Sequence, residues 1–135
     1  MREAHCGCGS LRIETEGEPT FVIMCHCEAC QRRTGAPYGV GAYFEVGQTR
    51  ISGDTNSYSR PTDGGRTLTN HFCPTCGTTV YWTTELFPKL VGIAVGCFTD
   101  PDFPPPQRSV FTKRKHAWMT VPDGADVFDE GSFRS

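Results

Sequence analysis

The sequence predicts a mostly β fold, built from short strands with little helix. The 135-residue chain contains 15 Gly and 10 Pro residues, spread along its whole length, and such frequent turn formers favour many short strands. The segments between them are rich in β-branched and aromatic residues, which suit strands. The length and ordinary composition fit one domain, which we expect to span residues 1–135.

The first half of the chain carries three strand patterns and the one helix pattern. Residues 11–14 read Leu-Arg-Ile-Glu, the alternation of a half-buried strand. Residues 20–24 are apolar and β-branched, and they run straight into a group of cysteines. Residues 38–46 are rich in Gly but also in aromatic and β-branched residues, which again indicates a strand. A helix of one or two turns is expected over residues 28–33.

The second half of the chain predicts a hairpin and two further strands. Residues 66–72 and 78–84 are rich in Thr and aromatic residues and flank a Cys-Pro-Thr-Cys-Gly turn, so we expect a hairpin with this turn at its tip. Residues 89–98 are almost wholly apolar, as in a strand buried on both faces. A Pro-rich loop is expected at residues 100–106, followed by a last strand at 109–112 and a loose C-terminal tail.

Charge and hydropathy argue against several classes of protein. The formal net charge of -2 disfavours a protein built around a nucleic-acid backbone. The longest run without a polar residue, 90–98, contains two Gly and is far shorter than the ~20 residues of a membrane-spanning helix. Residues 1–6 lack the apolar centre of a signal peptide. We therefore expect a cytoplasmic protein that contacts neither nucleic acid nor membrane.

Eight cysteines are the most informative feature of the sequence. Seven of them form tight groups, and only Cys97 stands alone; the groups are Cys6-x-Cys8, Cys25-x-Cys27-x-x-Cys30 and Cys73-x-x-Cys76. Disulfides would need an oxidising compartment, and cysteines so close in the chain pair poorly with one another. Tight turns instead deliver thiolates in pairs to a metal ion. This soft donor set favours zinc, with iron as the competitor.

Two of the cysteine pairs can form a closed metal site. Cys73 and Cys76 flank a knuckle in which Pro74 fixes the turn. Cys6 and Cys8 lie two apart on an extended chain, so both thiols point to one face. Four thiolates around one zinc ion are typical of a structural site.

The middle group then provides three ligands. Cys25, Cys27 and Cys30 leave a fourth position open, as catalytic zinc sites do. Alternatively, Cys27 and Cys30 join Cys73 and Cys76 in an ordinary zinc ribbon. The spacing alone favours neither division over the other.

The three cysteine motifs, in this order, resemble the glutathione-dependent formaldehyde-activating enzyme family, which also includes centromere protein V. The resemblance covers nearly the whole chain and rests on CGCGSL at 6–11, CHCEACQRRTG at 25–35 and FCPTCG at 72–77, with GCFTDP at 96–101 and Trp118 in support. It implies a small zinc-stabilised β-tent of short antiparallel strands. It also implies two zinc ions per chain, a structural one on Cys6, Cys8, Cys73 and Cys76 and a catalytic-type one on Cys25, Cys27 and Cys30.

The activity that the resemblance implies is a carbon–sulfur lyase-type reaction, in which glutathione and formaldehyde give S-hydroxymethylglutathione. The guanidinium groups of Arg32 and Arg33, close after Cys30, match the carboxylates of glutathione, so we expect them to bind this substrate. The alternative function is a non-catalytic module whose zinc anchors a thiol ligand or a protein partner. A cavity with basic groups beside the three cysteines would favour the enzyme, and a flat surface would favour the module.

Three further residues are weighed against structural roles. His26 lies between two predicted ligands and is expected to pack inside the fold or to face solvent. Cys97 ends an apolar run and is expected to fill the core. His71, just before the knuckle, is a candidate hydrogen-bond donor to one of its sulfurs.

Overall fold

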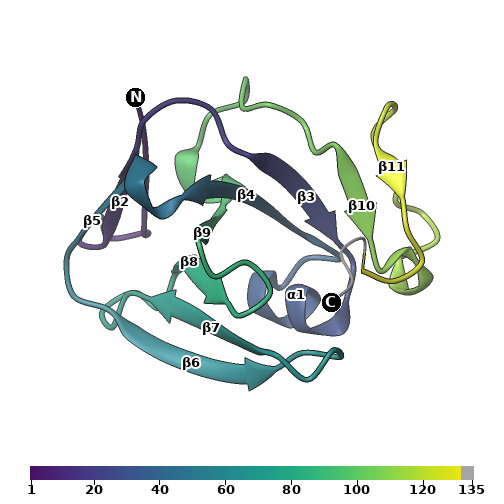
Figure 1. Ribbon diagram of the computed structural model, residues 1–135, viewed down its shortest axis with the longest axis horizontal. Coiled ribbons are helices and arrows are strands. Elements are labelled where there is room, and N and C mark those ends of the chain that lie inside the picture. The colour runs from purple at the N-terminus through teal and green to yellow at the C-terminus, as the bar shows by residue number, and fades with distance from the viewer. Residues whose placement is uncertain (132–135) are drawn as a thin grey trace.

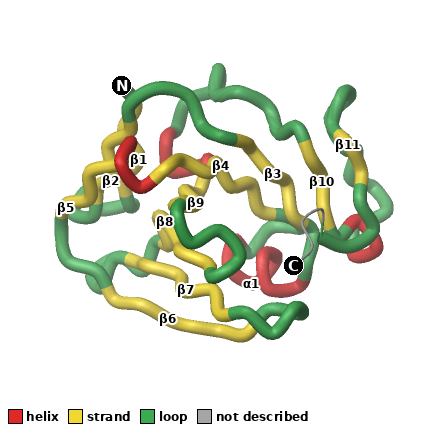
Figure 2. Tube along the Cα trace, in the orientation of Figure 1, coloured by secondary structure: helices red, strands yellow, loops and turns green. Residues whose placement is uncertain are grey.

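The structure, a computed structural model that describes residues 1–131, is mostly β, as predicted. Figure 1 shows a small sheet at one side of a larger, strongly curled sheet, and Figure 2 shows how little of the chain is helical. The smaller sheet has the strand order β1-β2-β5 and contains β1 (Arg2–His5), β2 (Arg12–Thr15) and β5 (Thr49–Ser52). None of the helices in residues 1–131 has the length and apolar composition that a membrane crossing requires.

The larger sheet has the strand order β11-β10-β3-β4-β9-β8-β7-β6. Its strands are β3 (Phe21–Cys25), β4 (Gly39–Glu45), β6 (Asn56–Pro61), β7 (Thr67–Phe72), β8 (Thr79–Thr84), β9 (Leu90–Ala94), β10 (Arg108–Val110) and β11 (Asp126–Val127). The predicted hairpin is present, because β7 pairs with β8 in antiparallel register. β10 pairs in parallel with both β3 and β11, whereas the other pairings are antiparallel.

Helix is confined to short segments. The helix α1 (Glu28–Thr34) follows β3 where a turn or two was expected, and it ends at Gly35, whose φ of 69° lies in the left-handed region. Short 3-10 helices occupy Val46–Gln48, Val95–Phe98 and Thr112–Arg114. In Figure 1, α1 lies between β3 and β4 on one side and β6 and β7 on the other.

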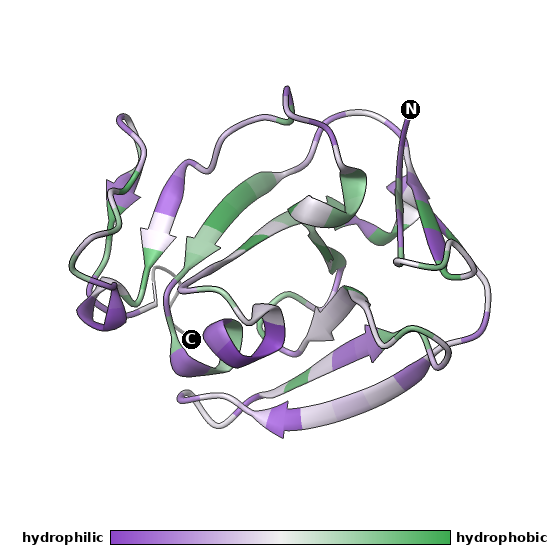
Figure 3. Cartoon of the chain, turned by 180° about the vertical axis from the view of Figure 1, so that it is seen from behind, coloured by the Kyte–Doolittle hydropathy of each residue, from purple (hydrophilic) through white to green (hydrophobic). Residues whose placement is uncertain are grey.

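Alternate residues of the central strands face two different environments. Successive side chains of a strand point to opposite faces of the sheet, so one face can be core while the other forms a site. Figure 3 shows apolar colouring along most of β3. One face of β3, β4, β8 and β9 packs against the smaller sheet, and the core between them includes Leu11, Ile13, Val22, Ala42, Phe44, Val80 and Ile93. The other face carries Ile23, Gly41 and Tyr43.

The expected strand at residues 89–98 is too long and needs correction. β9 ends at Ala94, and Val95–Phe98 turn away as a 3-10 helix. Thr99 follows with φ of 49°, and its backbone N–H donates to the carbonyl of Gly96. The apolar character of this segment therefore reflects burial of a turn as well as of a strand.

The expected loose tail after residue 112 also needs correction over residues 113–131. β11 pairs with β10, and the backbone N–H groups of Phe111 and Thr112 donate to the carbonyls of Glu130 and Phe128. β11 thus covers the side of β10 that β3 leaves unpaired and becomes the edge strand of the larger sheet. Residues 132–135 of the expected tail lie outside the described residues.

Candidate metal centres and active site

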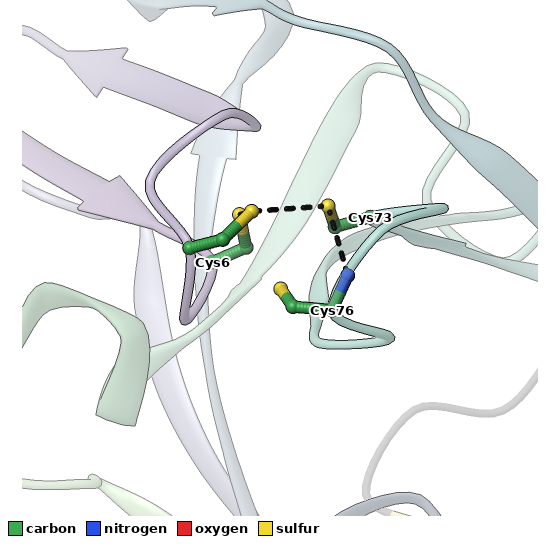
Figure 4. A group of neighbouring side chains, drawn as sticks. Cys6, Cys73 and Cys76 are labelled. Carbon is green, nitrogen blue, oxygen red and sulfur yellow. Dashed lines mark hydrogen bonds between the residues drawn. The ribbon is translucent and has the colours of Figure 1, made fainter.

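Four cysteines from two distant segments meet at one point. Cys6 and Cys8 follow β1, and Cys73 and Cys76 form the knuckle between β7 and β8. Their four sulfur atoms all lie within 4.8 Å of one another, and the Cys8 and Cys73 sulfurs are 3.6 Å apart. Figure 4 shows Cys6 on one segment with Cys73 and Cys76 on the other, their sulfurs turned toward a common centre. All are free thiols.

The donor set of this first cluster fits a zinc ion. A tetrahedron with zinc–sulfur bonds of about 2.3 Å has sulfur–sulfur edges of about 3.8 Å, close to the 3.6 Å observed between Cys6 and Cys8 and between Cys8 and Cys73. Backbone N–H groups also face the sulfurs: Leu11 donates to Cys6 at 3.3 Å, and Thr75 donates to Cys73 at 3.4 Å. Such donors stabilise the thiolate form that a metal requires.

Hydroxyl groups lower the pKa of two thiols in the first cluster. The hydroxyl of Thr78 lies 3.4 Å from the Cys76 sulfur and lowers the pKa of this thiol to about 5. The hydroxyl of Ser10 lies 3.2 Å from the Cys73 sulfur and lowers the pKa of this thiol to about 7. Both side chains are therefore prepared to be thiolates near neutral pH.

The second cluster forms where β3 passes into α1. Cys25 is the last residue of β3, Cys27 caps the N-terminus of α1, and Cys30 lies in its first turn. The backbone N–H of Cys30 donates to the Cys27 sulfur at 3.4 Å, so the helix cap and the cysteine cluster share one atom. The three sulfurs lie within 4.8 Å of one another, and all three side chains are half-buried.

The second cluster concentrates negative charge on one sulfur. Hydrogen bonds from Cys25 and Cys30 hold the pKa of Cys27 well below its usual range, while the hydrogen bond to Cys27 raises the pKa of Cys25. The Cys27 thiolate is thus stabilised by hydrogen bonds from the thiols of Cys25 and Cys30. A bound cation would allow all three to ionise, because it replaces the shared protons with positive charge. The second cluster therefore also fits a thiophilic metal ion.

A cavity of about 620 Å³ opens beside the second cluster and includes all three of its cysteines in the wall. Its floor is the second face of the larger sheet, on which Cys25 lies opposite Gly39 and Ile23 lies opposite Gly41. Close approach requires the glycine at position 41, because the Trp82 ring is rigid, whereas the end of the flexible side chain that faces Gly39 could shift. A Cβ at Gly39 would come within 2.5 Å of the Arg33 guanidinium, and one at Gly41 would come within 2.5 Å of the Trp82 ring.

Three side chains of the cavity wall are locked together. The guanidinium carbon of Arg33 lies 4.5 Å from the centre of the Trp82 ring, and Nε1 of Trp82 donates to the hydroxyl oxygen of Tyr43 at 3.0 Å. An indole N–H can only donate, so the hydroxyl oxygen of Tyr43 accepts and its own hydrogen points elsewhere. Burial raises the pKa of Tyr43 to about 12, so the phenol keeps this hydrogen at neutral pH.

The cavity has a surplus of positive charge. Of the three acidic residues in the described cavity wall, Glu28 pairs with Arg114 at 3.6 Å, Glu130 pairs with Lys113 at 3.2 Å, and Asp63 forms no ion pair. Arg33, Arg60 and Arg66 also line the cavity, and within the described chain none of the three forms an ion pair. The charge of Arg60 contributes to the low pKa of Cys27, after the larger hydrogen-bond effects. An anionic ligand would therefore find unneutralised arginines close to the sulfurs.

The two predicted substrate-binding arginines have different surroundings. Arg33 lies in the cavity wall over Trp82. The Arg32 side chain is 78% exposed, is not part of the cavity wall and pairs with Glu28 at 3.5 Å. Positions three apart share a helix face, whereas positions two apart do not, so Arg33 follows Cys30 toward the cavity and Arg32 turns away.

The other candidate residues have structural surroundings. His26 is fully buried, and its Nε2 lies 2.8 Å from the hydroxyl of Ser109. His71 stacks on Tyr81, with ring centres 4.5 Å apart, and makes no hydrogen bond to a sulfur within residues 1–131. Cys97 packs against the core, as expected, and its thiol donates to the carbonyl of Thr79.

Sequence reasoning missed Arg60, Tyr43 and Trp82 as cavity residues. No local motif marks these three, because strand pairing alone brings them to the cysteines. Gly92 opposite Tyr43 was the available hint, since a strand glycine often marks close approach by another group. Here the group is the Trp82 ring, which would overlap a Cβ at Gly92.

Comparison with known proteins identifies a solved structure with the same fold and the family of the chain. No curated protein matches the chain. A crystal structure of a Rhodobacter sphaeroides protein has the same fold, with a TM-score of 0.58 and 24% sequence identity, over 73% of this chain and 91% of that one. The family model described as glutathione-dependent formaldehyde-activating enzyme matches residues 1–114, a range that contains both cysteine clusters and most of the cavity wall. The chain therefore belongs to the glutathione-dependent formaldehyde-activating enzyme family.

Proposed function

We propose that the protein is a zinc-dependent enzyme of the carbon–sulfur lyase type that acts on an adduct of glutathione and an aldehyde, by forming S-hydroxymethylglutathione or by related thiol chemistry. Family membership supports glutathione-related formaldehyde activation at the level of the family. One observation carries the proposal for this chain: the three cysteines of the second cluster lie in the wall of a 620 Å³ cavity that also contains unpaired arginines.

The zinc ions of this proposal have distinct places. Cys6, Cys8, Cys73 and Cys76 would hold a structural ion, and Cys25, Cys27 and Cys30 would hold the other. An ion bound at three thiolates supplies an open position that lowers the pKa of a substrate thiol and stabilises its thiolate. A soft thiolate is the preferred partner for such a site.

Residues of the cavity wall would orient the substrate. The charges of Arg33 and Arg60 act on thiols of the second cluster, and their guanidinium groups can pair with the two carboxylates of glutathione. Trp82 fixes Arg33 by stacking, so little side-chain entropy is lost on binding. We propose no direct substrate contact for Arg32, because its exposed side chain lies outside the cavity wall.

Tyr43 would stabilise the oxygen of the aldehyde. In the addition step, the thiolate sulfur forms a bond to the carbonyl carbon, the carbonyl π bond breaks, and negative charge develops on oxygen. The free hydrogen of the Tyr43 hydroxyl can donate to this oxygen, as donors of an oxyanion hole do. The proton released by the thiol finally neutralises the oxygen, so no further reactant is needed.

The cavity favours this enzyme over the non-catalytic module. A module that anchors a partner protein would present the three cysteines on a flat or filled surface, whereas here they line a concave site of ligand size. We also propose that residues 1–135 act as one domain, since β11 lies beyond the family match yet pairs with β10. The free thiols support a reducing, cytoplasmic location.

The test is the rate at which the zinc-loaded protein equilibrates glutathione and formaldehyde with their adduct, measured by exchange NMR against the spontaneous reaction. We expect a rate above the spontaneous one, reduced by Arg33→Ala and unchanged by the matched variant Arg32→Ala. A rate no higher than the spontaneous one would contradict the proposed enzyme, and equal rates for the two arginine variants would contradict the proposed orientation.

A further inference from the structure

The loop between β6 and β7 carries two opposite charges at the edge of the cavity. It consists of residues 62–66, and its members in the cavity wall are Thr62, Asp63, Gly64 and Arg66. Neither Asp63 nor Arg66 takes part in an ion pair within residues 1–131. Figure 1 shows the loop at the end of the hairpin beneath α1. The loop therefore borders the same cavity as the second cluster.

Hydrogen bonds within the loop fix the position of Asp63. The backbone N–H and the hydroxyl of Thr62 both donate to the carbonyl of Arg66, at 2.7 and 3.0 Å. The backbone N–H of Gly65 donates to the carbonyl of Thr62 at 2.9 Å, and Gly65 has a φ of 79°. These bonds close a β-turn with Asp63 and Gly64 at its centre. The Asp63 carboxylate takes no part in them, so it is free to accept from a ligand.

Two of the unpaired arginines belong to the same hairpin as Asp63. Arg60 lies in β6, three positions before Asp63, and its charge acts on the Cys27 thiol. The guanidinium of Arg66 lies close to the turn, because a Cβ at Gly64 would be 3.8 Å from its Nη1 atom. One hairpin thus presents an anion and two cations to the cavity without pairing them to each other.

The two ends of glutathione differ in charge in a way that matches this hairpin. The γ-glutamyl end carries an ammonium group and a carboxylate on one carbon atom, whereas the glycine end carries a carboxylate alone. An ammonium group pairs with a carboxylate, and a guanidinium group pairs with a carboxylate of the ligand. Glu28 and Glu130 are already paired with cations, so Asp63 is the acidic residue of the described wall that is left for an ammonium group.

We propose that the loop at residues 62–66 recognises the γ-glutamyl end of glutathione, with Asp63 accepting a hydrogen bond from the ammonium group while Arg60 pairs with the carboxylate on the same carbon. This inference rests on the proposed function and assigns the direction of its substrate. The thiol lies at the second cluster, and the glycine carboxylate is left to Arg33, the unpaired arginine of α1. Asp63 then determines specificity, because it favours a thiol with an ammonium group at this end.

An analogue without the ammonium group isolates this contact. Glutaryl-cysteinylglycine has the thiol, the chain length and the two carboxylates of glutathione, and it lacks only the ammonium group. In calorimetric titrations of the zinc-loaded protein, we expect glutathione to bind about fivefold or more tightly than this analogue, because the analogue leaves Asp63 without its partner. Both ligands carry the same thiol, so the contribution of the metal ion cancels in the ratio of the two affinities. Native mass spectrometry checks that the metal is retained.

Two matched variants locate the preference. Asp63→Asn removes the charge and keeps the size of the side chain, and we expect the ratio of the two affinities to fall by about fivefold. Asn is common in turns and Asp63 is exposed, so this variant is expected to fold, and its circular dichroism spectrum checks this. Asp102→Asn removes the same charge from an exposed residue outside the cavity wall, and the ratio should not change.

The titrations separate this inference from the proposed function. If glutathione binds and Asp63→Asn keeps the wild-type ratio, the inference is wrong while the proposed function stands. If the ratio falls as expected but the reaction of glutathione with formaldehyde is no faster than the spontaneous one, the recognition stands and the proposed enzyme is wrong. An equal fall of the ratio in Asp63→Asn and Asp102→Asn would show an effect of overall charge and would overturn the inference.

Discussion

The guanidinium of Arg33 stacks on the ring of Trp82, with 4.5 Å between the guanidinium carbon and the ring centre. The same indole donates a hydrogen bond to Tyr43 and lies over Gly41 and Gly92. One buried side chain thus positions both a cation and a hydroxyl donor in the cavity next to the second cluster. Arg33 and Tyr43 belong to different elements, so Trp82 is what fixes their separation.

This arrangement predicts different effects for two neighbouring arginines. Arg33→Ala should weaken glutathione binding by about 1.5–3 kcal/mol, because a hydrogen-bonded charge pair with a carboxylate is lost. Arg32→Ala should change it by less than about 0.5 kcal/mol, because that side chain is exposed and its pair with Glu28 is a surface ion pair. Calorimetric titration of both zinc-loaded variants measures the difference, and equal losses would count against the role of Arg33.

The first cluster should be essential for folding. Zinc at a structural site contributes roughly 10 kcal/mol or more, which is comparable with the whole net stability of a typical domain. We therefore expect Cys73→Ser to be insoluble, or soluble but unfolded and free of metal. Cys97→Ser is the matched control, because Cys97 is half-buried but belongs to neither cluster. A Cys73→Ser protein with native thermal unfolding would contradict the structural assignment.

The fold should not depend on the zinc ion of the second cluster. Cys27→Ser removes one of three ligands and leaves the first cluster intact, so we expect loss of one zinc ion per chain and a native circular dichroism spectrum. Native mass spectrometry gives the metal count, and Cys97→Ser should keep both ions. Loss of both ions from Cys27→Ser, together with loss of the β spectrum, would show that the sites are not independent.

Tyr43 should make the protein less stable at alkaline pH. The phenol ionises near pH 10 in an unfolded chain, whereas burial raises the pKa of Tyr43 to about 12 in the fold. The folded state therefore binds this proton more tightly. The contribution to the free energy of unfolding is complete below about pH 10 and is lost as pH rises toward about 12, to a total of about 2–3 kcal/mol.

Urea unfolding at pH 8 to 11 measures this loss in three proteins. Tyr43→Phe should flatten the decline of the unfolding free energy above pH 10. Tyr58→Phe is the matched control, since Tyr58 is 64% exposed, and it should decline as steeply as the wild type. If the unfolding free energy of Tyr43→Phe declined as steeply as that of the wild type, the proton of Tyr43 would not be the cause of the lower stability at alkaline pH.

The two cysteine clusters could be predicted in large part from the sequence, because the spacing within each group is local. Two ligands at a time lie within one turn or one strand end, so the spacing within Cys73-x-x-Cys76 already implies a metal knuckle. The spacing did not decide which cysteine groups share a metal ion. The family resemblance favoured Cys6 and Cys8 as partners of the knuckle, and the structure brings these four sulfurs together.

Other features depend on long-range pairing and could not be predicted. The strand β6 was missed because it is an edge strand with polar, exposed residues and no apolar alternation. Trp82, Gly41 and Gly92 become neighbours only through the register of three strands. The difference between Arg32 and Arg33, by contrast, was already implicit in the helix period after Cys30.

In the function proposed above, the second cluster holds a zinc ion at which a thiolate binds inside the cavity. The most direct test is calorimetric titration of the zinc-loaded protein with glutathione across pH 6 to 9, with Cys27→Ser as the comparison. We expect weak binding that strengthens as pH rises toward the pKa of the glutathione thiol, because the bound form is the thiolate, and no binding to Cys27→Ser. Binding that is absent at every pH, or unchanged in Cys27→Ser, would contradict the account.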